Sequence, residues 1–247
     1  MLIGPQNLAE NVRAVRARIA AAAAQCGRNA HSVTIVAASK SQPLTAIEAA
    51  ARAGIAHFGE SYLQEALHKL AEAARNAPAT GSRTAAEASP SLTWHFIGQL
   101  QANKTRAIAE HFDWVHSVDR LRLAQRLSAQ RPYYAAPLNV CIQVNVAGEA
   151  SKAGVVPQEA QALVAAAAEL PRLRVRGLMC LPPAEEAPER QRHWFRELRH
   201  LFEELNDRGA SLDTLSMGMS ADLEAAVAEG ATMVRIGTAL FGPRPDH

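Results

Sequence analysis

The sequence is poor in cysteine and in aromatic residues, and it has no long block of one charge. Its three cysteines, Cys26, Cys141 and Cys180, are far apart and odd in number, so we expect neither a disulfide framework nor a zinc knuckle. The formal net charge is only +2 and both signs are mixed along the chain, which argues against a nucleic-acid-binding or membrane-binding surface. These shortages point to a globular protein of a reducing compartment.

Long apolar runs are also missing. The alanine runs at 20–24 and 165–168 are too short and too interrupted to span a bilayer. The first residues, "MLIGPQNLAENVRAVRARI", lack the basic start and long apolar segment of a secretory signal. We therefore expect a cytoplasmic protein with no membrane or nucleic-acid partner, and the scattered histidines give no metal-ligand motif.

What the sequence does contain is a regular alternation of two hydrophobic patterns. Residues 7–27 form an amphipathic helical segment at the start of the chain. Short runs rich in β-branched residues predict strands at 33–39, 55–61, 92–98, 114–118, 138–146, 173–181, 212–218 and 232–242. Helical periodicity predicts helices between them at 44–54, 62–75, 103–112, 120–130, 157–170, 189–209 and 220–230.

This alternation predicts an α/β fold with a parallel sheet and helices outside it. Eight such units in 247 residues fit a single-domain (β/α)8 TIM barrel with an extra amino-terminal helix better than an open doubly wound sheet. Periodicity alone does not show closure, but the G-x-G-x-x-G turn of dinucleotide-binding open sheets is absent. We expect one domain over 1–247, with the barrel core at 28–243 and a mobile surface loop at 76–91.

Small polar residues gather at the ends of the last two predicted strands. Ser216, Gly218 and Ser220 precede a predicted helix, whose free backbone N–H groups favour an anion. Ser220 can cap that helix or donate to a phosphate, and Gly237 and Thr238 follow the final strand. Either loop alone is explained by an ordinary turn or cap. Together they indicate a phosphate site, because barrels of this type commonly bind phosphate with these two loops.

The first predicted strand, "VTIVAASK", ends on Lys40, which would point into the open end of the barrel. Lys40 is either a solvated strand-end lysine or a partly desolvated amine that forms a Schiff base with a carbonyl. A phosphate site across the opening favours the second interpretation and suggests pyridoxal 5′-phosphate (PLP). Arg235, near the end of the last strand, would then face the pyridine nitrogen and keep the ring neutral. A sugar-phosphate enzyme with Lys40 as an aldolase-type base would need no cofactor.

Five motifs together resemble the YggS/PROSC family of pyridoxal-phosphate homeostasis proteins: "VAASKSQP", "FGESYLQE", "WHFIGQLQANK", "RGLMCLPP" and "SMGMSADLEAAVAEGATMVRIGTALFG". The resemblance runs from about residue 7 to residue 243. It implies a fold-type III PLP-binding barrel, like the N-terminal domain of alanine racemase. It also implies PLP bound covalently to Lys40, phosphate contacts from the "SMGMS" and "RIGT" loops, and Arg235 at the ring nitrogen.

Two further positions are interpreted through this resemblance. His95 belongs to the family's "HFIG" motif and would either lie near the cofactor or be structural. Ser61 stands where the family has asparagine, and a hydroxyl cannot reproduce the two-sided hydrogen bonding of an amide.

The function implied is intracellular PLP homeostasis, in which the protein buffers or delivers the cofactor and has no catalytic activity of its own. Its expected partners are PLP and, transiently, PLP-dependent apoenzymes, and it is expected to act as a monomer. A single barrel leaves the cofactor open to solvent on one side, which suits transfer better than chemistry. The alternative is a PLP-dependent amino-acid racemase or decarboxylase.

Overall fold

The computed structural model describes residues 5–76, 92–149, 152–185 and 187–243. Of the loop predicted at 76–91, only residue 76 falls within these ranges, as the last residue of helix α3 (Leu63–Asn76). The rest of that predicted loop lies outside the described residues.

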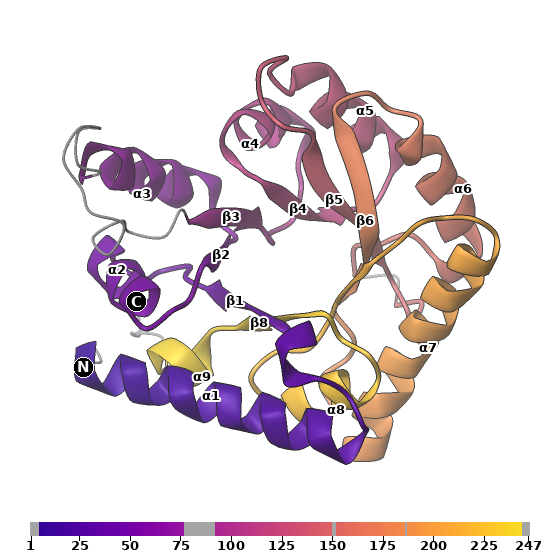
Figure 1. The fold of residues 1–247 in the computed structure, drawn as a ribbon. Helices are drawn as coiled ribbons and strands as arrows, with labels where there is room; N and C mark the ends of the chain where they lie inside the picture. The colour runs from indigo at the N-terminus through magenta and orange to yellow at the C-terminus, as the bar shows by residue number, and fades with distance from the viewer. Residues whose placement is uncertain (1–4, 77–91, 150–151, 186, 244–247) are drawn as a thin grey trace.

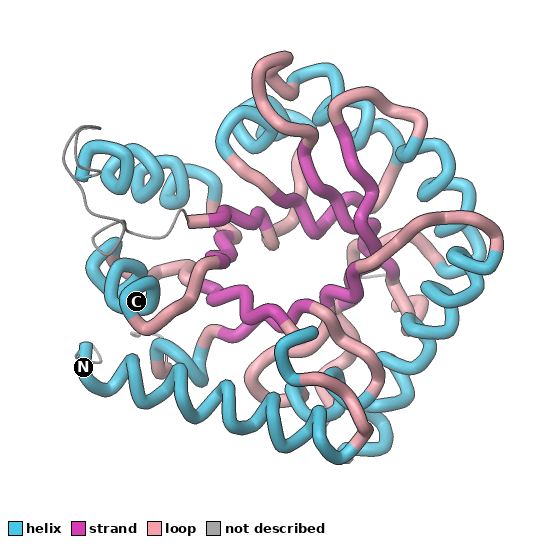
Figure 2. The backbone as a smooth tube through the Cα atoms, in the orientation of Figure 1, coloured by secondary structure: helices cyan, strands magenta, loops and turns pink. Residues whose placement is uncertain are grey.

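The described residues form a closed barrel of parallel strands, ordered β1-β2-β3-β4-β5-β6-β7-β8, which Figure 2 shows as a ring enclosed by helices. The prediction of a (β/α)8 barrel is confirmed. The strands are β1 (Thr34–Ala38), β2 (His57–Glu60), β3 (Thr93–Phe96), β4 (Trp114–Val118), β5 (Leu138–Val144), β6 (Leu173–Cys180), β7 (Thr214–Ser216) and β8 (Met233–Ile236).

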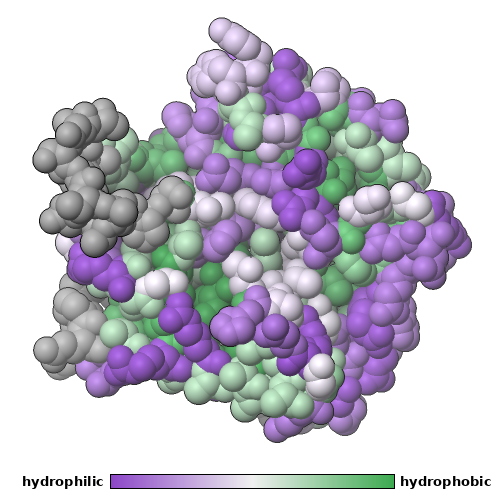
Figure 3. All heavy atoms as spheres, viewed as in Figure 1, coloured by the Kyte–Doolittle hydropathy of each residue, from purple (hydrophilic) through white to green (hydrophobic). Residues whose placement is uncertain are grey.

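Helices follow the strands in regular alternation and cover the outside of the ring (Figure 1). Besides α3 they are α1 (Pro5–Gln25), α2 (Leu44–Arg52), α4 (Thr105–His111), α5 (Leu121–Gln130), α6 (Pro157–Ala168), α7 (Pro188–Asp207), α8 (Leu223–Ala228) and α9 (Thr238–Phe241). Two 3₁₀ turns, η1 (Ala30–Ser32) and η2 (Ala102–Lys104), precede β1 and α4. The outer surface over α7 is mostly hydrophilic (Figure 3).

The extra amino-terminal helix α1 packs against α2, α8 and α9, and so covers the place where the barrel closes (Figure 1). Its predicted apolar stripe is the buried face: Leu8, Val12, Val15 and Ile19 are each exposed by 3% or less. The segment after β8, read from the sequence as a turn, is the short helix α9.

Side chains alternate between two cores, because successive residues of a strand point to opposite faces of the sheet. The larger core lies between the strands and the helices. A smaller apolar cluster, contributed by five different strands, fills part of the barrel interior and consists of Val36, Trp114, Cys141, Met179 and Met233. Other interior positions carry polar side chains, among them His95, His116, Ser216 and Arg235, which are fully or almost fully buried.

Gly177 of β6 lies so close to its neighbouring strand that a β-carbon there would sit 1.7 Å from the carbonyl oxygen of Thr214. We therefore expect Gly177→Ala to lower the free energy of unfolding by about 3 kcal/mol, measured by urea denaturation. As a control, Gly209→Ala places the new methyl in open space at φ +95° and should lose only about 1 kcal/mol. Equal losses in the two variants would contradict the steric explanation.

Candidate functional site

The carboxyl ends of β1, β7 and β8 meet at one end of the barrel, called the mouth below. β1 pairs with β8, so Lys40, two residues beyond β1, lies at the same edge as the loop that follows β8. A β-carbon on Gly237 in that loop would lie 3.5 Å from the carbonyl oxygen of Ala38. The Ala239 N–H donates to Ser220 Oγ at 3.2 Å and joins the loops after β7 and β8. The structure thus brings together the lysine and both loops that the sequence singled out.

A buried ion pair lies directly behind the segment that carries Lys40. The ammonium of Lys69, 5% exposed, lies 2.9 Å from Oε1 of Glu60, which is fully buried. Ser39 Oγ donates to the same carboxylate oxygen at 2.6 Å. Burial raises the pKa of Glu60, against the lowering effect of Lys69 and of the Ser39 hydrogen bond. Within the described residues Oε2 of Glu60 has no hydrogen-bond partner, so the Lys69 charge is the principal compensation.

This ion pair also fixes the backbone on both sides of Lys40. Lys69 Nζ donates to the carbonyl oxygen of Ser39 at 2.8 Å. On the other side, the Ser41 N–H donates to Glu65 Oε1 at 2.6 Å, and Glu65 in turn lies 2.5 Å from Lys69 Nζ. Ser41 has φ +62°, a left-handed conformation that is unfavourable for serine and is stabilised here by the hydrogen bond to Glu65. Lys40, partly buried, therefore leaves the strand along a fixed path.

The loop after β7 is shaped by a glycine and a carboxylate. Gly218 has φ +92°, and a β-carbon there would lie 2.4 Å from the side chain of Ala226, so only glycine fits. The Met219 N–H donates to Asp222 Oδ1 at 2.5 Å. Burial raises the pKa of Asp222, while this hydrogen bond and the charge of Arg235 lower it.

The predicted role of Ser220 as a helix cap is not what the structure shows. Helix α8 begins only at Leu223, and its N-cap residue is Asp222. The Ser220 hydroxyl instead accepts the hydrogen bond from Ala239 across the mouth. Gly237 and Thr238 open the short helix α9, as its N-cap residue and first residue. The hydrogen bond between Ser220 and Ala239 therefore brings together the two loops with which barrels of this type commonly bind a phosphate.

Arg235 lies inside the barrel beneath the mouth and is 5% exposed. Its Nη1 donates to the carbonyl oxygen of Ser216 at 2.7 Å and to Ser216 Oγ at 2.8 Å. Its Nη2 donates to the carbonyl oxygen of Cys180 at 2.9 Å. Burial lowers the pKa of Arg235, but a guanidinium stays charged in proteins. A guanidinium has five N–H groups, more than these three hydrogen bonds use.

His95 is fully buried in the barrel interior. Its Nε2 lies 2.9 Å from Nδ1 of His57, and its Nδ1 lies 2.8 Å from Nε2 of His116. His116 Nδ1 lies 2.7 Å from Ser216 Oγ, the atom that also accepts a hydrogen bond from Arg235. The structure therefore links the predicted residues His95, Ser216 and Arg235 through His116, and His57 extends the path beyond His95; sequence reasoning missed both of these histidines. Three strand histidines at inward-facing positions were the only available signal.

Neither a metal site nor a membrane anchor is found in the part of the chain that the structure describes. It contains no group of three or more histidine, cysteine, aspartate or glutamate side chains placed to hold a metal ion. No helix within the same ranges is both long enough and apolar enough to cross a bilayer.

Comparisons with known proteins agree with the site. The chain matches the family model described as alanine racemase, N-terminal domain, over residues 3–245. It is 54% identical over 237 residues to a Pseudomonas aeruginosa protein named pyridoxal phosphate homeostasis protein, covering 96% of each chain. It is 49% identical over 238 residues to the protein of that name from Escherichia coli, covering 96% of this chain and 97% of the relative. These matches confirm the resemblance seen in the sequence motifs.

A solved structure matches the whole fold as well. PipY of Synechococcus elongatus, solved with PLP bound, has a TM-score of 0.78 and 36% sequence identity to this chain. The match covers 95% of this chain and 100% of PipY.

Replacing Lys69 with methionine tests the ion pair behind Lys40, because the Glu60 carboxylate is then buried without its counter-charge. We expect Lys69→Met to lower the free energy of unfolding by about 3–5 kcal/mol at about pH 8. The loss of Lys69 raises the pKa of Glu60 further. A carboxyl group whose pKa is raised in the folded state destabilises the protein at pH values above that pKa. This loss of stability becomes smaller as the pH falls through the raised pKa toward the ordinary value of 4.5. Urea unfolding at several pH values should therefore show a deficit that shrinks in acid.

Two further variants complete this test. The double variant Lys69→Met/Glu60→Gln should recover most of the loss, because no buried charge is left unpaired. Arg106→Met removes a cation from an exposed ion pair with Glu110 and should change stability by no more than about 0.5 kcal/mol. A deficit that is independent of pH, or that the double variant retains, would show that Lys69 acts by packing alone.

Proposed function

The chain belongs to the alanine racemase N-terminal domain family, together with the pyridoxal phosphate homeostasis proteins, and we propose that it binds PLP at the mouth and holds it for other proteins. One observation carries the proposal. The barrel places Lys40, two glycine-containing loops and the buried cation Arg235 around one opening. PipY, which is related over its whole length, has been solved with PLP bound.

The residues at the mouth fit this cofactor. When bound, PLP supplies an aldehyde that a lysine amine can attack, together with a phosphate and a pyridine nitrogen as further anchors. Lys40 would provide the amine, and its path is fixed by the hydrogen bonds on either side of it. The phosphate would be held by two segments: Ser216, Gly218 and Ser220 at and after the end of β7, and Gly237 and Thr238 after β8. Arg235 would donate to the ring nitrogen.

A role in holding rather than transforming is supported by the relatives, which are named for homeostasis and not for a reaction. We propose that the protein acts as a monomer without turnover of its own and gives PLP to apoenzymes on transient contact.

Lys40→Ala tests the assignment of the lysine. The purified wild-type protein mixed with PLP should develop the visible absorption of lysine-bound cofactor and, after borohydride reduction, gain one cofactor mass on Lys40. Lys40→Ala should lose both signals, whereas Lys104→Ala, the same change on η2, should keep them. Absence of bound PLP in the wild type by both methods would overturn the proposal.

Transfer and turnover distinguish holding from catalysis. The loaded protein should restore the activity of an apo aminotransferase, and it should leave a panel of free amino acids unchanged. Racemisation or decarboxylation of any of them, lost in Lys40→Ala, would instead establish a PLP-dependent enzyme.

A further inference from the structure

A chain of polar side chains crosses the interior of the barrel from one end to the other. His57 is the first residue of β2, and the strand register places His95 of β3 two residues further toward the mouth. The β3–β4 register then places His116 two residues further than His95. Ser216, the last residue of β7, completes the path and accepts a hydrogen bond from Arg235. The path therefore runs from the amino-terminal end of the barrel to the mouth.

Each contact in this path is short enough to hold one proton. The ring nitrogens are 2.9 Å apart between His57 and His95 and 2.8 Å apart between His95 and His116. His116 Nδ1 lies 2.7 Å from Ser216 Oγ. A neutral imidazole has one nitrogen that donates and one that accepts, so the direction of one contact dictates that of the next.

The Ser216 hydroxyl sets this direction together with Arg235. Arg235 can only donate to Ser216 Oγ, and among the described residues the other partner of that oxygen is Nδ1 of His116, so the hydroxyl proton finds its acceptor there. His116 then carries its proton on Nε2 and donates to Nδ1 of His95. His95 likewise carries its proton on Nε2 and donates to Nδ1 of His57. All three histidines are thereby placed in the Nε2–H tautomer.

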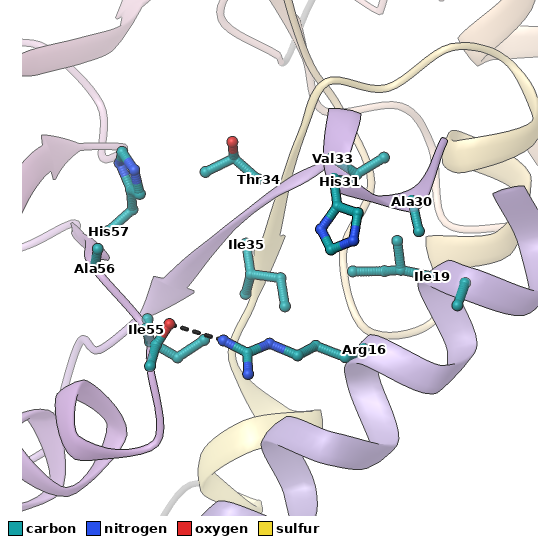
Figure 4. A pocket seen from close by; sticks show the side chains of 12 residues that line it. Arg16, Ile19, Ala30, His31, Val33, Thr34, Ile35, Ile55, Ala56 and His57 are labelled. Carbon is teal, nitrogen blue, oxygen red and sulfur yellow. Dashed lines mark hydrogen bonds between the residues drawn. The ribbon is translucent and has the colours of Figure 1, made fainter. Parts of the chain in front are cut away.

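The His57 end of this hydrogen-bond path opens on a cavity of about 600 Å³ between α1, η1 and the first residues of β1 and β2. Figure 4 shows that His57 lines this cavity together with His31 of η1 and the apolar residues Ile19 and Ile35. Arg16 reaches across from α1 and donates to the carbonyl oxygen of Gly54 at 2.8 Å. His57 is only partly buried, whereas His95 and His116 are fully buried, so protons reach the chain first at His57.

We propose that Ser216, His116, His95 and His57 are positioning residues for Arg235. They form a hydrogen-bond chain of one direction that orients the guanidinium beneath the mouth, and protonation of His57 disrupts it. A proton added to Nδ1 of His57 meets the Nε2–H of His95 in the same 2.9 Å contact. The conflict is relieved only if His95 and His116 both change tautomer. His116 then donates to Ser216 Oγ beside Arg235, and the Ser216 hydroxyl proton loses its acceptor.

Burial favours the neutral form of all three histidines at pH 7. Burial lowers the pKa of His57, with Asp113 acting in the opposite direction. Burial, helped by the neighbouring histidines, lowers the pKa of His95 well below 6.5. Burial and the charge of Arg235 lower the pKa of His116 to about 3.

Around Arg235 itself the facing groups are Asp222, Cys141 and Cys180, and the Asp222 carboxylate favours the charged form of Arg235. Burial raises the pKa of both thiols to about 12, so at pH 7 neither adds a charge beside the guanidinium. Arg235 therefore remains the fixed positive end of the chain across the range in which His57 titrates.

The direction of the chain can be measured without any cofactor, by ¹⁵N NMR of the full protein labelled in its histidines. We expect His57, His95 and His116 to carry their proton on Nε2 at about pH 7.5. Ser216→Ala should leave His116 with a mixed tautomer, because it removes the donor to Nδ1. A proton on Nδ1 of His116 in the wild type would overturn the proposal, as would an unchanged His116 signal in Ser216→Ala.

The consequence for Arg235 rests on the proposed function and is measured as PLP affinity. His116→Leu should weaken binding by about tenfold, because it interrupts the chain. His116→Gln should recover most of the loss, since an amide both accepts and donates. His111→Gln, an exposed histidine of α4 outside the chain, should bind as the wild type does. Equal affinities for His116→Leu and the wild type would overturn the positioning role.

The pH dependence isolates His57. His57→Gln keeps an acceptor for His95 but cannot take up a proton near neutral pH. Its affinity at about pH 7.5 should match the wild type, and it should lack the extra weakening that the wild type shows below about pH 6.5. Coincident pH profiles would exclude His57 as the point of proton entry. If the wild type bound no PLP at all, the proposed function would fail, and the tautomers would decide on the chain alone.

Discussion

The pairing of β1 with β8 is the constraint on which the rest of the molecule depends. It joins strands from opposite ends of the chain in parallel register, from Thr34 opposite Met233 to Ala37 opposite Ile236. Closure places the segment after β1 beside the loops after β7 and β8, so Lys40 meets two glycine turns that are remote from it in sequence. It also removes both edges of the sheet and turns half of every strand inward. The site and the polar interior both follow from this one junction.

A closed barrel could be filled with branched aliphatic side chains, but this one buries two cations on either side of Lys40. Behind the strand, Lys69 is compensated by Glu60 and by the carbonyl oxygen of Ser39. Inside the barrel, Arg235 is compensated by carbonyl oxygens and by a hydroxyl instead of by a carboxylate. Burying a charge is costly unless its hydrogen-bonding groups are satisfied. Both cations therefore depend on the carbonyl oxygens and side chains that surround them.

Most of the fold was predictable because its signals are local. Helices and strands differ in hydrophobic period, and their regular alternation in this length favoured a barrel before closure could be seen. The strand at 114–118 was predicted to the residue. The ends after β7 and β8 were less predictable. Helix α8 begins after Asp222, and Ser220 bonds across to the neighbouring loop, because tertiary contacts compete there with local capping.

The site was predictable only in part. Functional residues of such barrels lie at the carboxyl ends of the strands, and this expectation could be applied to Lys40, to Arg235 and to each of the two loops separately. The roles of His57 and His116 depend on the stagger between neighbouring strands, which no single strand reveals. Spacing along the chain could not show that these histidines lie within one hydrogen bond of His95, because the register is set by packing on both faces of the sheet.

The histidine chain explains how an interior of this kind can hold a cation in one orientation. An aliphatic core tolerates repacking as long as its volume is kept. A path of hydrogen bonds with one proton in each contact does not tolerate such changes, because reversing the direction of one contact obliges the other contacts to reverse as well. Arg235 at one end and neutral imidazoles along the path leave a single arrangement of donors and acceptors. The cost is sensitivity to acid: the lowered pKa values of His57 and His116 mean that the stability they contribute is present above about pH 6.5 and is lost as the pH falls. The same neutral histidines that orient the Arg235 guanidinium therefore make the barrel interior sensitive to acid.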